Sequence, residues 1–399
     1  MATKKLYEED SFLTQCTANV LECSPKGDSW QVVLDQTVFF PEGGGQPSDA
    51  GTLGGAAMSY AAERDGVVYH TVDAPLTVGE TVEAQIDWAR RLDHIQQHSG
   101  EHILSYAIWK KYGVGNIGFH LGRDTVTIDL TRALTQEELD GAEDFANQIV
   151  WEDKPVSTFW RQDDQLETLD MRKKTEKVEG LLRIVAMEGG DVCTCCGTHV
   201  SRTGQVGPIK ILRQDSHKGG VRIEFICGGR AIEDYRSKHR QISALGAALS
   251  TKDEGILAAV SNLREEAASL RGQLRARSAL LMAARAKELL ADHAAQGNYP
   301  AVATAQNDIG AQEAKQLLTE LLKTENMTAA VVYADGERVG YLIGSSGKGD
   351  CKNLCQVANG LFGGKGGGSA TFAQGSGKLS AGWQESVALL EKAIRDMAR

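Results

Sequence analysis

Several features that mark other protein classes are missing from this 399-residue sequence. No apolar run approaches the length of about 20 residues that a membrane-spanning helix needs, and the N-terminal MATKKLYEED has no apolar signal segment. We therefore expect a soluble, cytoplasmic protein that makes no contact with a membrane.

An excess of positive charge is missing as well. Lys and Arg number 43 against 53 Asp and Glu, so the formal net charge is -10. This balance excludes a generally basic nucleic-acid coat protein, although a local positive groove on an acidic protein can still bind RNA.

Cysteines are too few for a disulfide scaffold in a chain of this length. Of the eight, three lie in the segment CTCCGTH as Cys193, Cys195 and Cys196, followed by His199. In a reducing compartment, cysteines that cluster beside a histidine indicate metal or thiol chemistry rather than disulfide bonds. The remaining five are expected to be small buried apolar residues: Cys16, Cys23, Cys227, Cys351 and Cys355.

Four regions differ in their sequence pattern, and together they predict an α+β protein. Residues 1–90 contain β-rich segments and glycine-rich turns, which indicate a small β-barrel or sandwich; we favour the barrel. Residues 91–230 alternate helix and strand patterns and are expected to form an α/β domain. Residues 231–297 have no proline and almost no strand signal, which predicts a helical spacer, and residues 298–399 return to an α/β pattern.

The spacer carries a regular apolar seam. Thr251 and Glu254 match a capping box, and after them apolar residues follow the a/d spacing of a coiled coil. The seam residues are Ile256, Val260, Leu263, Ala267, Leu270, Leu274 and Leu281. Such a seam pairs either within the chain or with a second copy, and we favour a homodimer through the spacer and the C-terminal domain.

The segment DHIQQHSGEHIL carries three histidines at intervals of four, His94, His98 and His102. On a helix, neighbours at this spacing share a face, whereas His94 and His102 would lie about 12 Å apart along the axis. Only adjacent pairs can readily hold one metal ion together, and His98 belongs to both pairs.

Further along the chain, CCGTH places Cys195 and His199 at C-x3-H spacing. Two imidazoles from a helix, one thiolate and a third imidazole form a tetrahedral donor set of the kind that suits zinc. We therefore expect Zn2+ as a cofactor.

The motifs resemble those of a known family. HSGEHIL and CCGTHVSRTGQVGPIKI resemble the paired signatures of the alanyl-tRNA synthetase editing domain and of its free-standing AlaX-type alanyl-tRNA editing homologues. LDQTVFFPEGGGQPSDAGTL is similar to the family's glycine-rich segment, and VRIEFICGGRA to the strand that ends its editing domain. GLFGGKGGGSATFAQGSG resembles the glycine-rich element of the C-terminal C-Ala (DHHA1-type) domain, so the whole resembles the long AlaX form.

The resemblance implies that the zinc ligands are His98, His102, Cys195 and His199. His94 is then either a group beside the metal or a surface histidine, and we favour the surface. The chain departs from the family at Cys196, where glycine is usual, so Cys196 and Cys193 remain alternatives to Cys195.

The reaction implied is hydrolysis of the ester that joins a wrong amino acid to tRNA(Ala), chiefly serine, with glycine as a second candidate. No class II aminoacylation domain precedes the motifs and no Asp-His-His triplet occurs, so neither tRNA charging nor phosphodiester hydrolysis is expected. Zinc could activate water, or a closed four-ligand site could only position the substrate. The alternative function is a non-catalytic, zinc-stabilised tRNA-binding protein.

Candidate substrate-binding residues follow from the same resemblance. A site that hydrogen-bonds the serine hydroxyl can spare alanine, and Thr37 is the family-matched partner. Gln46 could hold the carbonyl or the ribose, and its presence with Thr37 favours an enzyme. Backbone approach to the terminal adenosine is expected at Gly43, Gly44 and Gly45. Contacts to the body of the tRNA are expected at Gly363, Gly364, Lys365, Gly366, Gly367, Gly368, Phe372 and Gln374, with a flexible linker as the alternative.

Overall fold

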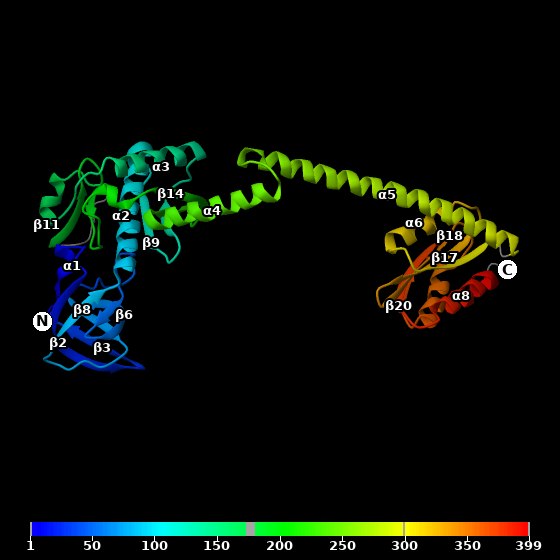
Figure 1. The fold of residues 1–399 in the computed structure, drawn as a ribbon, viewed down its shortest axis with the longest axis horizontal. Coiled ribbons are helices and arrows are strands. Elements are labelled where there is room, and N and C mark those ends of the chain that lie inside the picture. Colours follow the sequence, from blue (N-terminus) through cyan, green and yellow to red (C-terminus); the bar gives the residue numbers. More distant parts are fainter. Residues whose placement is uncertain (1, 173–179, 298–299, 398–399) are drawn as a thin grey trace. The chain divides into compact units, whose positions relative to one another are not determined.

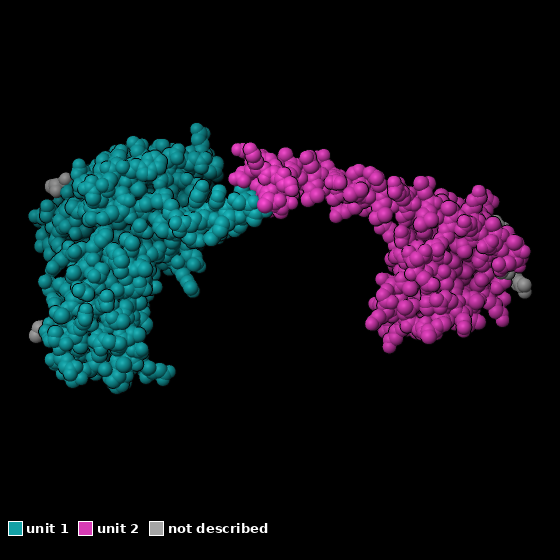
Figure 2. Space-filling view, in the orientation of Figure 1, with its two compact units in different colours: residues 1–244 teal, residues 245–399 magenta. Residues whose placement is uncertain are grey.

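The computed structural model describes residues 2–172, 180–297 and 300–397. Two compact units make up the chain, residues 1–244 and 245–399, coloured teal and magenta in Figure 2. The predicted mixture of helices and sheets is confirmed. Within the described ranges, no helix is long and apolar enough to cross a membrane. The expected start of the last domain, residue 298, lies outside these ranges.

The first unit begins with a closed barrel of six strands. In barrel order they are β2 (Gln15–Lys26), β3 (Ser29–Leu34), β7 (Val67–Val72), β6 (Ala56–Arg64), β5 (Gly51–Leu53) and β8 (Thr81–Ile86). Successive side chains of a strand point to opposite faces, so alternate residues such as Val68, His70 and Val72 are buried inside. The short elements β1 (Lys4–Lys5), α1 (Leu6–Glu9) and β4 (Gln36–Thr37) flank it.

Helix α2 (Trp88–Tyr112) follows the barrel directly. Asp87 caps its first turn by accepting a hydrogen bond from the backbone N–H of Arg90, and Gly113 ends it in the left-handed conformation at φ 65°. Most of its residues are buried, because the barrel, a sheet and a second helix surround it (Figure 1).

That sheet and helix complete the main core of the first unit. The sheet order is β14 (Ile209–His217), β15 (Gly220–Cys227), β10 (Val126–Leu130) and β9 (Asn116–Leu121). Helix α3 (Gln136–Trp151) packs beside α2, and a capping box of Thr135 and Glu138 begins it. Helix α4 (Gly228–Ala248) leads out of the unit.

A buried ion pair fastens the barrel to α2. The guanidinium of Arg91 is fully buried and donates from Nε to Asp49 at 3.0 Å. Its Nη1 donates to the carbonyl of Ser11 at 2.8 Å and its Nη2 to the carbonyl of Val38 at 2.6 Å. Because these acceptors lie on three separate segments that flank the barrel strands, one side chain fixes this region against the start of α2.

A small three-stranded sheet carries the second metal-binding segment. Its order is β11 (Val156–Gln162), β12 (Leu181–Met187) and β13 (Val192–Thr194), with the 3-10 turns η1 (Asp163–Thr168) and η2 (Thr203–Val206) nearby in sequence. β13 ends one residue before Cys195, so this sheet delivers the CCGTH segment.

The second unit begins with a 3-10 turn, η3 (Asp253–Gly255), and the 40-residue helix α5 (Ile256–Ala295). The predicted capping box of Thr251 and Glu254 is wrong. The N-cap of α5 is Gly255, which has no side-chain cap, so the helix starts later than predicted. The middle of the apolar seam is exposed: Leu263 57%, Leu270 55% and Leu274 69%.

The rest of this unit is a five-stranded sheet between two pairs of helices. Its order is β16 (Ala301–Gln306), β17 (Thr328–Asp335), β18 (Arg338–Ser345), β20 (Phe372–Lys378) and β19 (Lys365–Gly368). Helices α5 and α6 (Ala311–Leu321) pack on one face, and α7 (Cys351–Leu361) and α8 (Trp383–Met397) on the other. The flexible-linker alternative for the glycine run is wrong, because residues 365–368 pair with β20 as an edge strand.

Candidate metal site and substrate cavity

Two of the three regularly spaced histidines face a third from the CCGTH segment. His98 and His102 lie one turn apart on α2, with ring centroids 5.3 Å apart. The ring of His199 lies 4.6 Å from each of them. All three side chains are buried.

Cys195 completes the cluster. Its Sγ lies 3.4 Å from Nε2 of His98 and 3.2 Å from Nε2 of His199. One ligand atom from each of His98, His102, Cys195 and His199 lies within 4.8 Å of the others, so the group could hold a metal ion. The turn needs Gly197, because a Cβ there would lie 2.1 Å from the ring of His98.

The opposite ring nitrogens of the histidines are held by polar partners. Nδ1 of His98 lies 2.8 Å from Oε1 of Gln46, and Nδ1 of His199 lies 3.3 Å from Oγ of Ser99. Nδ1 of His102 lies 3.1 Å from Oδ2 of Asp191. Partners of this kind fix the orientation of ligand imidazoles and leave Nε2 for a metal.

The cluster favours a thiolate. Burial alone raises the pKa of the Cys195 thiol, but the charge of His98 and hydrogen bonds from His102 and His199 outweigh burial, and the pKa lies well below its usual value. Burial lowers the pKa of His199 to about 3, which keeps that ring neutral. Thiolate and neutral imidazole are the forms that bind metals, and Cys195 and His199 are in those forms. Cys193 and Asp191 outweigh burial at His102 and raise its pKa well above the usual value, so a metal would have to displace a proton there.

The two alternative cysteines lie in different surroundings. Cys193 is buried, with its Sγ 3.2 Å from Nδ1 of His102, and belongs to a separate group with His102 and Asp191. Burial raises the pKa of Cys193 to about 11, which disfavours its thiolate. Cys196 is exposed and belongs to neither group. The structure therefore brings Cys195 to the three histidines.

His94 lies one turn before the cluster and outside it. The residue is 5% exposed, so the expectation of a surface histidine is wrong. Burial lowers its pKa to about 4. Residues on several faces of α2 are buried along this stretch, His94 among them. The spacing of the histidines could not predict that burial.

Of the expected substrate residues, Gln46 lies against the cluster and Thr37 does not. The Gln46 side chain is buried and, besides His98, contacts Thr198, with its Nε2 donating to Oγ1 at 2.9 Å. Thr37 is fully buried, and its Oγ1 lies 2.8 Å from Nε2 of His70 inside the barrel. Gln46 therefore acts on the histidine and the CCGTH turn, while the Thr37 hydroxyl already has a partner.

A cavity of about 170 Å3 opens beside the cluster. Of the three expected glycines, Gly44 lines it, Gly45 packs against Phe119 and Gly43 forms a bridge to Gln46. The lining residues that sequence reasoning missed are Glu101, Asn116, Gly118, Phe119, Arg172 and Thr194. Glu101 had a signal, since it stands inside HSGEH three residues after His98; the others come from segments without a motif.

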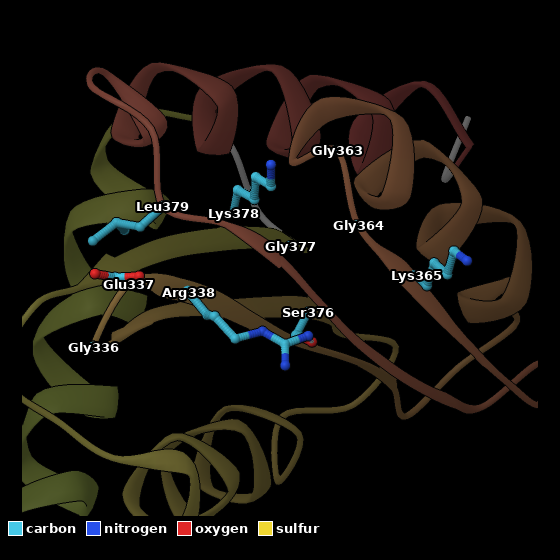
Figure 3. A pocket seen from close by; sticks show the side chains of 10 residues that line it. All are labelled: Gly336, Glu337, Arg338, Gly363, Gly364, Lys365, Ser376, Gly377, Lys378 and Leu379. Carbon is cyan, nitrogen blue, oxygen red and sulfur yellow. Dashed lines mark hydrogen bonds between the residues drawn. The ribbon is translucent and has the colours of Figure 1, made fainter.

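A second candidate site lies in the other unit, at the glycine-rich strand. The pocket has a volume of about 830 Å3 and is lined by Gly363, Gly364 and Lys365 of the expected residues (Figure 3). The pocket lining also contains two cations that sequence reasoning missed, Arg338 and Lys378. They lie opposite each other on the paired strands β18 and β20. Figure 3 shows Arg338 reaching toward Ser376, whose Oγ accepts from its Nη2 at 2.6 Å.

The remaining expected RNA contacts lie further along the same strands. Gly366, Gly367 and Gly368 continue the exposed edge strand β19, and Gln374 is exposed beside Gly367. Phe372 is half-buried and packs against the core under α5 and α6, so only part of its ring faces solvent.

Family models match three parts of the chain. The model described as threonyl and alanyl tRNA synthetase second additional domain matches residues 182–224, which include the CCGTH segment. The model of class II (A) tRNA synthetases matches residues 7–90, and the DHHA1 domain matches residues 298–397.

Curated relatives match over most of the chain. Alanyl-tRNA editing protein AlaX-L of Pyrococcus horikoshii is 29% identical over 93% of this chain and 94% of its own length. Alanyl-tRNA editing protein Aarsd1 of Mus musculus is 32% identical over 65% of this chain and 67% of its own length. Alanine–tRNA ligase of Pyrococcus abyssi is 38% identical over 60% of this chain but only 27% of its own length. Among solved structures, the C-Ala domain from Aquifex aeolicus alanyl-tRNA synthetase matches 24% of this chain at 24% identity, with a TM-score of 0.22.

Proposed function

The chain belongs to the family of alanyl-tRNA editing proteins, and from this premise we propose that it is an aminoacyl-tRNA deacylase acting on mischarged tRNA(Ala). The observation that carries the proposal is a buried His/Cys cluster that opens onto a small cavity. Serine is the proposed main substrate amino acid and glycine the second.

Zinc is the proposed metal. Three buried imidazoles and one thiol with a lowered pKa match the donor set that zinc prefers, and a partner on each Nδ1 supports binding through Nε2. Bound zinc would supply Lewis-acid polarisation of the ester carbonyl. His98, His102, Cys195 and His199 would hold it, with Gln46 and Asp191 orienting two of the rings.

The protein's own groups would bind and orient the acyl group. The small cavity excludes bulky amino acids, and the backbone at Gly44 would approach the terminal adenosine. Thr37 remains the proposed partner of the serine hydroxyl; because its hydroxyl now contacts His70, the substrate hydroxyl would have to compete with that ring. Gln46 would act by holding His98 in place.

The glycine-rich strand and its cations form the proposed contact with the body of the tRNA. Lys365, Arg338 and Lys378 are exposed and would contact phosphates, while the glycine backbone allows close approach. Stacking on Phe372 and a hydrogen bond from Gln374 would add to this contact.

The four sequence regions, 1–90, 91–230, 231–297 and 298–399, remain our proposed domains. We also retain the proposal of a homodimer, because the exposed leucines of α5 form an apolar seam that a second copy would cover. A non-catalytic, zinc-stabilised tRNA-binding protein is the second candidate function, favoured by a ligand set that is already complete with four protein groups.

Deacylation of Ser-, Gly- and Ala-tRNA(Ala) by the wild type and by His102→Ala, with zinc content measured on both, tests the proposal. We expect the wild type to bind zinc and to release serine and glycine but not alanine, and the variant to lose both zinc and activity. A wild type that holds zinc but leaves all three esters intact is the binding protein of the second proposal.

A further inference from the structure

One charged side chain in the cavity has no part in the metal site described above. Glu101 lies next to His102 on α2 and lines the cavity. The residue is 5% exposed. Removing a carboxylate from water is costly unless a cation or several donors compensate, so its presence needs a physical reason.

Hydrogen bonds fix one of the two carboxylate oxygens. Oε1 of Glu101 accepts from Oγ of Ser105 at 2.6 Å and from Nδ2 of Asn116 at 2.7 Å. Asn116 is itself held, because its Oδ1 accepts from the backbone N–H of Gly118 at 2.9 Å. Oε2 lies 3.8 Å from Nε2 of His102, on the side of the metal cluster. The carboxylate is thus held in one orientation with Oε2 toward the cluster.

No Lys or Arg among the described residues that line the cavity is free to pair with Glu101. Among the described residues that line it, Arg172 is the one Lys or Arg. Its guanidinium donates to both oxygens of Asp191, at 2.9 and 3.0 Å, so these two charges balance each other. Among ion pairs between described residues, Glu101 has His102 as its partner and neither a Lys nor an Arg. The cavity therefore presents a negative group to whatever enters it.

We propose that Glu101 binds the α-ammonium group of the aminoacyl ester, an inference that rests on the deacylase function proposed above. An aminoacyl ester carries this cation one carbon from the carbonyl, whereas a peptidyl ester or another acyl ester of RNA does not. A hydrogen bond between ammonium and carboxylate is charge-assisted and stronger in a site shielded from water. Glu101 thus selects esters of free amino acids and orients the carbonyl relative to the cluster.

The size of the cavity agrees with this assignment. Its volume of about 170 Å3 is smaller than that of ordinary small-molecule pockets, which run from roughly 300 Å3 upward. The ring of Phe119, stacked on His98 at 5.0 Å between centroids, closes one side. A small amino acid fits such a space, and its ammonium would have the carboxylate of Glu101 as its partner.

The test measures binding of two non-hydrolysable analogues of the tRNA 3′ end to the full chain. Both replace the ester by an amide; one carries serine, and the other carries glyceric acid, with a hydroxyl in place of the ammonium. We expect the wild type to bind the seryl analogue at least about tenfold more tightly, the effect of one hydrogen bond to a charged group. Glu101→Gln, which keeps an acceptor for Ser105 and Asn116, should bind both analogues alike.

Metal content and a matched control separate other roles of Glu101. We expect Glu101→Gln to keep the wild-type metal content, and Glu137→Gln, at an exposed carboxylate on α3, to keep the wild-type preference. A Glu101→Gln variant that loses metal would make Glu101 a metal ligand and overturn the proposal. A wild type with no preference, or a variant that retains it, would also overturn it.

Deacylation of Ser-tRNA(Ala) by the wild type, measured in parallel, separates this inference from the proposed function. A chain that shows the binding preference but releases no serine fails as a deacylase while Glu101 keeps its role. A chain that releases serine, and whose Glu101→Gln variant keeps the preference, remains a deacylase and loses only the inference.

Discussion

The cavity beside His98 and the pocket beside Lys365 differ in size, burial and charge. The first has a volume of about 170 Å3 and walls of buried and half-buried side chains, whereas the second has about 830 Å3 and is lined by glycines, exposed cations and Glu337. In the first, polar partners hold each imidazole of the cluster in one orientation. Lys365 and Lys378 instead project freely from the strands (Figure 3).

The difference reflects what each site would have to do. Holding a metal and a reacting ester requires fixed geometry, so every ring needs a second partner. Contact with a phosphate backbone depends on the number of cations near it rather than on their exact placement. Changes in the first site should therefore cost far more per residue than changes in the second.

Loss of a proposed ligand should give the largest effect. Cys195→Ser is expected to reduce the rate of deacylation of Ser-tRNA(Ala) by at least about a thousandfold. The proposed zinc would stabilise the charge of the transition state by several kcal/mol, and this stabilisation would be lost with the metal. Zinc content should fall with it. Cys196→Ser, one residue away, is the matched control and should retain metal and activity; the reverse pattern would make Cys196 the ligand.

Acid should destabilise the first unit through the buried histidine next to Thr37. Burial lowers the pKa of His70 from 6.5 to about 4, so this ring gains its proton more readily in the unfolded chain. Its contribution to stability is full above pH 6.5 and is lost as pH falls toward 4. At 1.36 kcal/mol per pH unit, the loss reaches about 3 kcal/mol.

Denaturant unfolding at stepped pH checks this expectation. His70→Gln should be less stable at pH 7 but should lose less stability than the wild type between pH 6.5 and 4. His239→Gln, at an exposed position on α4, should follow the wild-type curve. Equal slopes for His70→Gln and the wild type would show that the barrel tolerates a charged ring there.

Loss of a residue that only orients a ring should have a smaller effect than loss of a ligand. Gln46→Ala frees Nδ1 of His98 and the Thr198 turn, and should weaken zinc binding by about 10- to 100-fold. Competition with a chelator measures this affinity. Gln85→Ala, on the exposed face of β8, is the control. An unchanged affinity would mean that the cluster orients itself without Gln46.

The smallest effect per residue is expected in the tail pocket. Replacing Arg338, Lys365 and Lys378 by Ala should weaken binding of whole tRNA by roughly three- to tenfold at low salt and flatten its salt dependence. Binding of an isolated aminoacylated 3′ end should not change. Lys252→Ala, at an exposed site outside the pocket, is the control. A steep salt dependence in the triple variant would move the tRNA contact to another surface.

The site could be predicted from the sequence where spacing determines position. A C-x3-H turn and an i, i+4 pair of histidines each bring two donors to one side of a short segment. Spacing therefore predicted His98 and one neighbouring histidine, while the choice of His102 and of Cys195 came from the resemblance to the editing family. Asp191 and Arg172 could not be predicted, because the β12–β13 pairing and the fold of a motif-free segment bring them to the cluster.

The fold could be predicted to a similar extent. The a/d spacing indicated α5, but the predicted start of that helix was wrong, because a 3-10 turn over Asp253–Gly255 takes the place of its predicted first turn. A flexible linker was the alternative prediction for the glycine run at residues 365–368, because glycine weakens strands. Pairing with β20 outweighs that tendency, and the lack of a Cβ allows the close approach, since one at Gly366 would lie 2.5 Å from the carbonyl oxygen of Gln374.

The buried pair of Arg91 and Asp49 limits how the chain can be recombined. It crosses the sequence-based boundary at residue 90, so a graft of another barrel onto α2 would have to bring its own carboxylate and carbonyl acceptors for Arg91. Without them, a charge left buried and unpaired costs about 3–5 kcal/mol. The barrel and the helix that carries His98 and His102 are therefore expected to be inherited as one piece.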